Sequence, residues 1–198
     1  MPLFSKFLTR ARLAQVKKQL GRKVLDLGCG HGELLEHLAP GVDWVVLVDR
    51  SPERRARVEK KLSSQAVHGR FVLADIEQGK IDLPAASFDT VVMAALLEHL
   101  EKPEVALREI LRLLEPGGKL LLTTPTPLGG WVHMVTSYLG LTYREAAEEH
   151  VIFYGKPRLI SLLELHAFEV QLFKSFLFGL NQFVLARKKE EVTSSKPL

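Results

Sequence analysis

The fold is decided by a short stretch near the N-terminus, Val24-Leu25-Asp26-Leu27-Gly28-Cys29-Gly30-His31-Gly32-Glu33. An apolar run of strand length leads into a turn with three glycines, and a helical segment follows. Glycines let the backbone approach a ligand closely, and the N–H groups at the start of a helix point toward it. We therefore predict a strand, a ligand-binding turn and a helix, in this order.

Two common phosphate-binding loops share this order of strand, turn and helix. The dinucleotide fingerprint requires Gly-x-Gly-x-x-Gly, but the sixth position here is Glu33. The phosphate loop of nucleoside triphosphatases ends in Gly-Lys-Ser or Gly-Lys-Thr, and His31-Gly32-Glu33 has no lysine. An acid also stands where a phosphate would sit, which is unfavourable at a helix N-terminus. The loop therefore favours a ligand without phosphates.

Apolar runs alternate with amphipathic segments along the first two thirds of the chain. The strand-like runs are 24–27, 44–48, 71–73, 90–93 and 120–123. The helical segments between them are 33–38, 52–62 and 103–114. This alternation predicts a parallel sheet that is covered by helices on both faces.

The last third of the chain changes the pattern. Residues 125–149 contain no strand, 157–165 are typical of a helix, and 168–178 and 180–187 are strand-like around Gly179. We predict that the last two strands form an antiparallel hairpin at the end of the sheet. The predicted fold class is α/β, a Rossmann-like three-layer sandwich with a seven-stranded, mostly parallel sheet.

Two further acids follow predicted strands. Asp49 ends the second strand, 21 residues after Gly28, where a carboxylate can accept hydrogen bonds from both ribose hydroxyls. Asp75 ends the third strand, where its side chain and the next amide are expected at an adenine edge. The alternative is that both acids only cap the turn or helix that follows them. Together with the glycine loop, the acids favour a nucleoside-binding site.

The chain resembles the class I S-adenosylmethionine-dependent methyltransferases over about residues 22–187. The matching segments, in family order, are Asp26-Leu27-Gly28-Cys29-Gly30-His31-Gly32, Asp49, Asp75, Phe88-Asp89-Thr90-Val91-Val92-Met93 and Leu114-Glu115-Pro116-Gly117-Gly118-Lys119-Leu120. The resemblance implies S-adenosyl-L-methionine as the cofactor, with Gly28 and Ala94 near its methionine part. The implied cofactor-binding set is Asp26, Gly28, Cys29, Gly30, Asp49, Arg50, Asp75, Ile76 and Ala94. Cys29 is interpreted as a small residue that fits the turn, and not as a nucleophile.

The acceptor side is expected to involve two histidines. Leu97-Glu98-His99-Leu100 is similar to a Leu-Glu-His stretch of the ubiquinone-biosynthesis O-methyltransferases, but Ala95 replaces their earlier metal-holding glutamate, so we predict no metal. His150 begins a segment similar to the His-x-x-Phe segment of small-molecule and lipid methyltransferases. We interpret His150 as the first candidate for a base or acceptor-orienting residue, and His99 as the second. The alternatives are a loop-ordering role for His99 and a surface cap for His150.

Composition supports one domain, 1–187, followed by a polar tail, 188–198, that we expect to be disordered. Within the domain we expect an N-terminal helix, 1–21, and a lid insert, 126–149, whose aromatic residues suit an apolar acceptor. The single cysteine excludes an internal disulfide, and no apolar run is long enough for a signal peptide or membrane span. We therefore expect a cytoplasmic protein.

The first 23 residues hold seven Lys or Arg residues and no acid. Such a helix either lies on an anionic membrane or closes over the cofactor with its cations solvated. The rest of the chain is nearly neutral and has no Asn-Pro-Pro-Tyr motif, so nucleic acid is not expected as the acceptor. The predicted function is methyl transfer to a small-molecule or lipid-like acceptor. The alternative is a non-catalytic binding or scaffold protein with the same fold.

Overall fold

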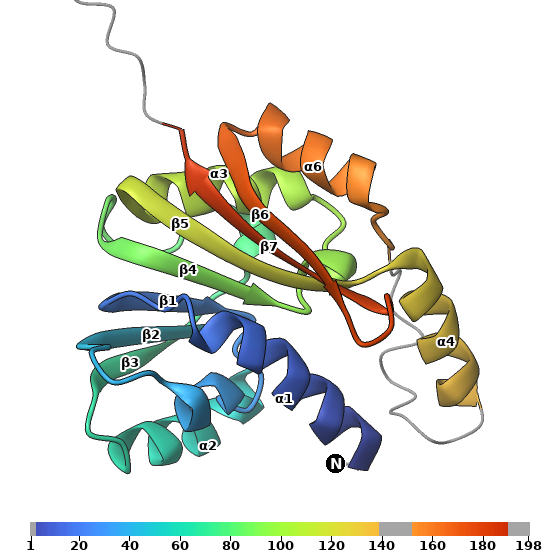
Figure 1. Ribbon diagram of the computed structural model, residues 1–198. Coiled ribbons are helices and arrows are strands. Elements are labelled where there is room, and N and C mark those ends of the chain that lie inside the picture. Colours follow the sequence, from blue (N-terminus) through green and yellow to red (C-terminus); the bar gives the residue numbers. More distant parts are fainter. Residues whose placement is uncertain (1–2, 139–151, 190–198) are drawn as a thin grey trace, which may run out of the picture.

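One seven-stranded sheet forms the centre of the protein, with strand order β3-β2-β1-β4-β5-β7-β6 (Figure 1). The computed structural model describes residues 3–138 and 152–189. The strands are β1 (Lys23–Leu27), β2 (Trp44–Asp49), β3 (His68–Leu73), β4 (Phe88–Ala94), β5 (Leu114–Pro125), β6 (Phe168–Phe176) and β7 (Asn181–Lys188). The first five strands are parallel, and β7 lies antiparallel to both β5 and β6. The predicted fold class is confirmed, including the C-terminal hairpin.

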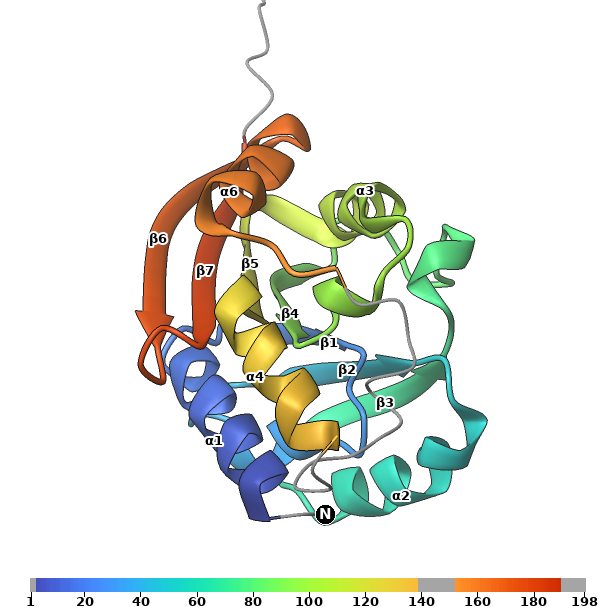
Figure 2. The ribbon, with the colours of Figure 1, turned by 90° about the vertical axis from the view of Figure 1, so that its right-hand side faces the viewer.

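Helices cover both faces of this sheet (Figure 2). The α-helices are α1 (Leu3–Lys17), α2 (Pro52–Ser63), α3 (Pro103–Leu113), α4 (Pro127–Tyr138) and α6 (Lys156–Leu165). Three short 3₁₀ helices are η1 (Glu33–His37), η2 (Ile76–Gln78) and η3 (Leu97–His99). α2, α3 and α6 each begin with a proline in the first turn, where its missing N–H costs no intrahelical hydrogen bond.

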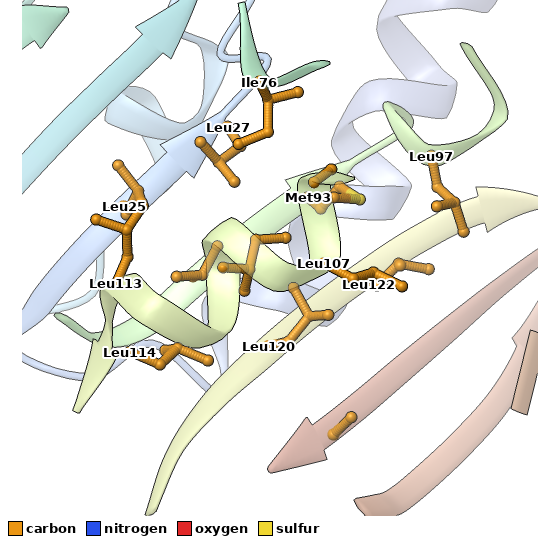
Figure 3. Close-up of a cluster of buried hydrophobic side chains, with 14 of the residues drawn as sticks. Leu25, Leu27, Ile76, Met93, Leu97, Leu107, Leu113, Leu114, Leu120 and Leu122 are labelled. Atoms are coloured by element: carbon orange, nitrogen blue, oxygen red, sulfur yellow. The ribbon is translucent and has the colours of Figure 1, made fainter. Parts of the chain in front are cut away.

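The hydrophobic core has two layers, one on each face of the sheet. On one face, α3 and α6 pack on β1, β4 and β5, as Figure 3 shows for Leu107 and Leu113 of α3 against the strand leucines. On the other face, Leu13 and Val16 of α1 join side chains of η1 and α2. Burying a leucine of this kind contributes about 1.5–3 kcal/mol. The sheet is therefore held rigidly from both sides, which fixes the positions of its strand ends.

Three elements differ from the sequence prediction. α1 ends at Lys17 and not at Gly21. β5 begins at Leu114 and contains the predicted helix-ending segment 116–118, because Leu114 pairs with Phe88 before the register shifts. α4 occupies the first half of the predicted lid, 126–149, for which no helix is predicted, and 139–149 lies outside the described residues.

The order of the parallel strands reverses direction between β1 and β4, which is the topological switch point of the sheet. β1 pairs with β2 on one side and with β4 on the other, so the crossing connections leave a crevice at the carboxyl ends of these strands. Within the described part of the chain, no helix has the length and apolar character needed to cross a membrane. The crevice between β1 and β4 is therefore the first place to look for a ligand.

Candidate functional site

Two adjoining cavities occupy the crevice at the carboxyl ends of β1, β2 and β4. The first measures about 360 Å³ and extends from the glycine loop toward Asp75 and His99. The second measures about 420 Å³ and lies between the loop and α1. Gly28, Arg54 and Ala95 line both cavities. The two cavities together form one elongated site, which is the shape expected for a nucleoside joined to a second group.

The glycine loop has the backbone that only glycine adopts easily. Gly28, Gly30 and Gly32 have φ angles of 67°, 57° and 71°, in the left-handed region. The amides of Gly28 and Cys29 both donate to the Val48 carbonyl, at 2.9 and 3.0 Å, which fixes the loop against β2. A Cβ added at Gly28 would lie 2.9 Å from the Leu96 side chain. The loop is therefore closely fitted to its neighbours and open toward the cavities.

Asp49 joins the glycine loop to the end of β2. Its carboxylate accepts hydrogen bonds from the Gly30 amide (2.9 Å), the Ser51 amide (2.9 Å) and the Arg54 guanidinium (2.8 Å). The side chain is 3% exposed and faces the first cavity. Asp49 thus makes the capping bond of the alternative interpretation and also lines the cavity, so the two roles coexist. Arg50, the next residue in the predicted set, lines the same cavity.

Asp75 and Ile76 lie at the far end of the first cavity. One carboxylate oxygen of Asp75 accepts a hydrogen bond from the Glu77 amide at 3.0 Å and caps η2. Ile76 is buried and presents an apolar wall. An acid and an aliphatic side chain at one end of the cavity suit an adenine ring, which offers polar edges and an apolar face. Their contact with a ligand stays a prediction.

Asp26 lies at the end of β1 and lines the second cavity together with Cys29, Gly30 and Ala94. It is 4% exposed, and burial raises its pKa well above the usual carboxyl value, with Glu33 and Asp49 adding to the effect. Burial likewise raises the pKa of the Cys29 thiol, which keeps the sulfur protonated and unreactive. A raised thiol pKa agrees with the interpretation of Cys29 as a small residue that fits the turn.

Arg12 of α1 is a site residue that the sequence interpretation did not include. It was expected to be solvated with the other cations of the helix, but it is half-buried, lines the second cavity and donates from Nε to Asn181 Oδ1 at 2.8 Å. Burial lowers its pKa, and the negative charge of Glu98 opposes this effect. No local pattern separates Arg12 from the other basic residues of the first 23, because its orientation depends on Asn181, 169 residues away.

Glu98 belongs to the interior and not to the cavity wall. Its side chain is 3% exposed and accepts a hydrogen bond from the Thr124 hydroxyl at 2.9 Å, while its carbonyl accepts from the Ile152 amide. These bonds connect η3 to the end of β5 and to the segment before α6. Glu98 therefore holds together the elements around Ala95 and does not face solvent as a free base.

The structure places one of the two candidate catalytic histidines. His99 is half-buried and lines the first cavity, on the side of Asp75 and Leu100. His150 lies outside the described residues, so its role as a base stays a prediction. Among residues 3–138 and 152–189, no cluster of three or more His, Cys, Asp or Glu side chains is arranged to hold a metal ion.

Solved structures with the same fold define the class of this protein. A crystal structure of an S-adenosylmethionine-dependent methyltransferase from Methanosarcina mazei superposes with a TM-score of 0.68 at 21% identity, covering 90% of this chain and 98% of the other. The 1,6-didemethyltoxoflavin-N1-methyltransferase of Burkholderia thailandensis, solved with S-adenosylhomocysteine bound, gives a TM-score of 0.70 at 19% identity, covering 92% and 79%. The fold is that of the class I methyltransferases.

The family follows from sequence. The profile of a methyltransferase domain family matches residues 4–172, so the chain belongs to that family. A ubiquinone biosynthesis O-methyltransferase of Xanthomonas oryzae pv. oryzae is 39% identical over an alignment of 125 residues, and the match covers 59% of this chain and 50% of that protein. The chain thus spans about half the length of the curated relatives it matches. S-adenosyl-L-methionine is the cofactor, as the resemblance predicted.

The residues present fit this cofactor. Gly28 and Gly30 of the loop line the cavities without a side chain, and a buried carboxylate, that of Asp49, lies beside the loop for the ribose. Acids line both cavities, which is unfavourable for a pyrophosphate. Asp49 and Asp75 would hold the nucleoside, and the loop with Asp26, Ala94 and Arg12 would hold the amino acid part.

Proposed function

We propose that this protein transfers the methyl group of S-adenosyl-L-methionine to a small, apolar or lipid-like acceptor. The observation that carries the proposal is the pair of adjoining cavities: both are lined by Gly28, Arg54 and Ala95, and strand-end acids line each of them. When bound, the cofactor supplies a sulfonium methyl group, which is an electrophile. The protein has to bind the cofactor and the acceptor, align the acceptor atom with the methyl group, and exclude water.

The second cavity suits the zwitterionic end of the cofactor. A methionine group carries an α-ammonium and an α-carboxylate, and the second cavity offers Asp26 for the first and Arg12 for the second. Arg12 is held by Asn181, so its guanidinium is oriented before the ligand arrives. This pairing anchors one end of the cofactor while Asp49 anchors the ribose.

The acceptor side is apolar in its described part. α4 crosses in front of the carboxyl ends of the strands (Figure 2), and it lies so close to Phe153 that a Cβ at Gly130 would be 2.3 Å from the ring. Ala94, Ala95 and Leu96 line the cavities beside the glycine loop and give them an apolar section. Apolar walls with few polar groups suit an aromatic or aliphatic acceptor. Because the X. oryzae relative is an O-methyltransferase, hydroxylated acceptors are the first to test.

The direct test is transfer of a radioactive methyl group. The purified protein is incubated with methyl-labelled S-adenosyl-L-methionine and pools of phenols, hydroxylated quinones and fatty acids, and label in the organic extract is counted. Calorimetric titration with S-adenosyl-L-methionine, and separately with NADH, establishes binding. Label transfer supports the proposal, whereas tight cofactor binding without transfer to any pool supports the non-catalytic alternative.

Arg12→Met is expected to weaken cofactor binding by about tenfold or more, because a hydrogen bond to a charged group contributes ~1.5–3 kcal/mol. Arg10→Met is the matched control, since Arg10 is an exposed arginine of the same helix that lines neither cavity. Calorimetry measures both affinities. Unchanged cofactor affinity with reduced turnover would assign Arg12 to acceptor binding. No change in affinity or turnover would show that Arg12 has no role in the site.

Asp26→Asn is expected to stabilise the cofactor-free protein and weaken cofactor binding. The folded-state pKa of Asp26 lies above the usual value of 3.8, so its contribution to stability is complete below that pH and is lost as the pH rises through the raised pKa. Asparagine stays neutral, so this pH dependence disappears. Thermal melting from pH 4 to pH 8 compares the two proteins, and parallel curves would contradict the assignment.

The same carboxyl group links cofactor binding to pH. An ammonium placed beside Asp26 lowers the pKa of this carboxyl, so binding releases a proton and tightens as the pH rises. Titrations in two buffers with different ionisation enthalpies count the protons released. We expect release in the wild type and none in Asp26→Asn.

A further inference from the structure

Three large apolar side chains protrude at one place on the surface. Leu128 and Trp131 of α4 are 58% and 60% exposed, and Phe178, in the turn between β6 and β7, is fully exposed. The two elements are joined directly, since the Thr126 hydroxyl donates to the Gly179 carbonyl at 2.7 Å and the Thr126 amide donates to the Leu180 carbonyl at 3.0 Å. We call Leu128, Trp131 and Phe178 the apolar tip.

The shape of α4 turns this tip outward. Gly129 and Gly130 face inward, because a Cβ at Gly129 would lie 1.8 Å from the Leu180 carbonyl oxygen and one at Gly130 would meet the Phe153 ring. Leu128 and Trp131 are three residues apart and therefore share the opposite face of the helix. The glycine pair thus seats α4 against the turn while the bulky residues point away from the protein.

Backbone strain at the turn adds an independent observation. Leu177 and Phe178 have φ angles of 52° and 55°, in the left-handed region that bulky side chains avoid. Phe178 is fully exposed, so no packing compensates for the strain. Asparagine or glycine would serve the turn better, and the folded protein alone gives no reason for phenylalanine there. Backbone strain without compensating packing often occurs at functional sites.

The charges around the tip have one sign. α1 lies on the other side of the turn, where Arg12 bonds to Asn181 and Gln15 accepts from Lys174 Nζ at 3.1 Å; Figures 1 and 2 both show α1 beside this turn. α1 exposes Phe7, Lys6, Arg10 and Lys17. α1, α4 and residues 177–180 contain no acid. The surface therefore complements a negatively charged partner that accepts apolar side chains.

We propose that the apolar tip inserts into the interface of an anionic phospholipid bilayer, with the cations of α1 against its headgroups. The tip is convex, formed by the outer face of a helix and the apex of a turn, whereas a protein partner usually requires a broad complementary patch. Aromatic side chains favour the bilayer interface, and each cation near an anionic surface adds attraction. This inference stands apart from the proposed methyl transfer.

The two tryptophans of the chain allow a sharp test. Trp131 is in the tip, whereas Trp44 begins β2 at the opposite end of the strands and is 40% exposed. In W44F, Trp131 is the reporter, and we expect its emission to shift to the blue with vesicles of phosphatidylcholine and phosphatidylglycerol. In W131F, Trp44 reports and should not shift. Pure phosphatidylcholine vesicles should bind less, and 0.5 M salt should weaken binding to the anionic ones.

Phe178→Asn separates the surface role from folding. Asparagine tolerates the left-handed backbone, so the melting temperature should stay equal or rise, while vesicle co-sedimentation should weaken by about tenfold. Leu165→Ser is the matched control, because Leu165 is 82% exposed at the end of α6 and outside the tip. Equal sedimentation of Phe178→Asn and the wild type overturns the proposal. Light scattering that shows a tip-dependent dimer, without vesicle binding, overturns it in favour of self-association.

Discussion

We expect Gly28→Arg to abolish cofactor binding: the affinity should fall more than a hundredfold, which is a loss of about 2.8 kcal/mol in binding free energy. Gly28 lines both cavities, so a long side chain at this position fills the junction that the ligand has to cross. Even a Cβ would stand 2.9 Å from Leu96, and the φ of 67° is costly for any other residue. Calorimetric titration with S-adenosyl-L-methionine measures the loss.

Gly79→Arg is the control for this variant. Gly79 also has a positive φ, 98°, but its Cβ would meet nothing within 4 Å and it lines neither cavity. Both variants therefore add backbone strain and an arginine side chain, but only Gly28→Arg obstructs the site. If Gly28→Arg folds, as judged by circular dichroism, and binds like Gly79→Arg, the cofactor does not occupy these cavities.

Asp49→Ala is expected to weaken cofactor binding by about 10- to 150-fold, the equivalent of ~1.5–3 kcal/mol for a hydrogen bond to a charged group. The variant removes the carboxylate that faces the first cavity and also frees the Gly30 and Ser51 amides and Arg54. Unfolding in urea should show lower stability as well, because a buried hydrogen-bonding group is lost. Affinity is measured at the same fraction folded.

Asp43→Ala is the matched control at the other end of the same strand. Asp43 precedes β2, pairs with Arg22 at 2.6 Å on the surface, and is more than half exposed, so its loss removes the same charge at little cost. We expect wild-type affinity. Equal affinity of Asp49→Ala and Asp43→Ala for the cofactor would place the ribose elsewhere.

The sequence was sufficient for the sheet because its strands are nearly continuous apolar runs. Val24 to Leu27 and Val45 to Val48 are buried on both faces, so their composition alone identifies them. The glycine loop and Asp49 were equally readable, because positive φ angles and strand-end acids leave a fixed residue pattern. The family resemblance then supplied the cofactor, which the family match confirmed.

Other parts of the site depend on tertiary contacts that leave no local pattern. Arg12 is separated from its partner Asn181 by 169 residues. The sequence around the seven basic residues of the N-terminal segment does not indicate which of them faces inward. α4 escaped prediction because Gly129 and Gly130 are poor helix formers, and they are tolerated where the helix backbone packs closely on Leu180 and Phe153. No local sequence pattern identifies the acceptor either.

With the ribose contact that we propose for Asp49, Arg54 would compete with the cofactor for the same carboxylate. An ionised carboxylate offers about four acceptor positions, of which the Gly30 amide, the Ser51 amide and Arg54 use three. A ribose brings two hydroxyl donors, so one existing partner has to leave. Arg54, 41% exposed, is the partner free to move. The measured dissociation constant is then the intrinsic value divided by the fraction of molecules in which Arg54 has already swung away.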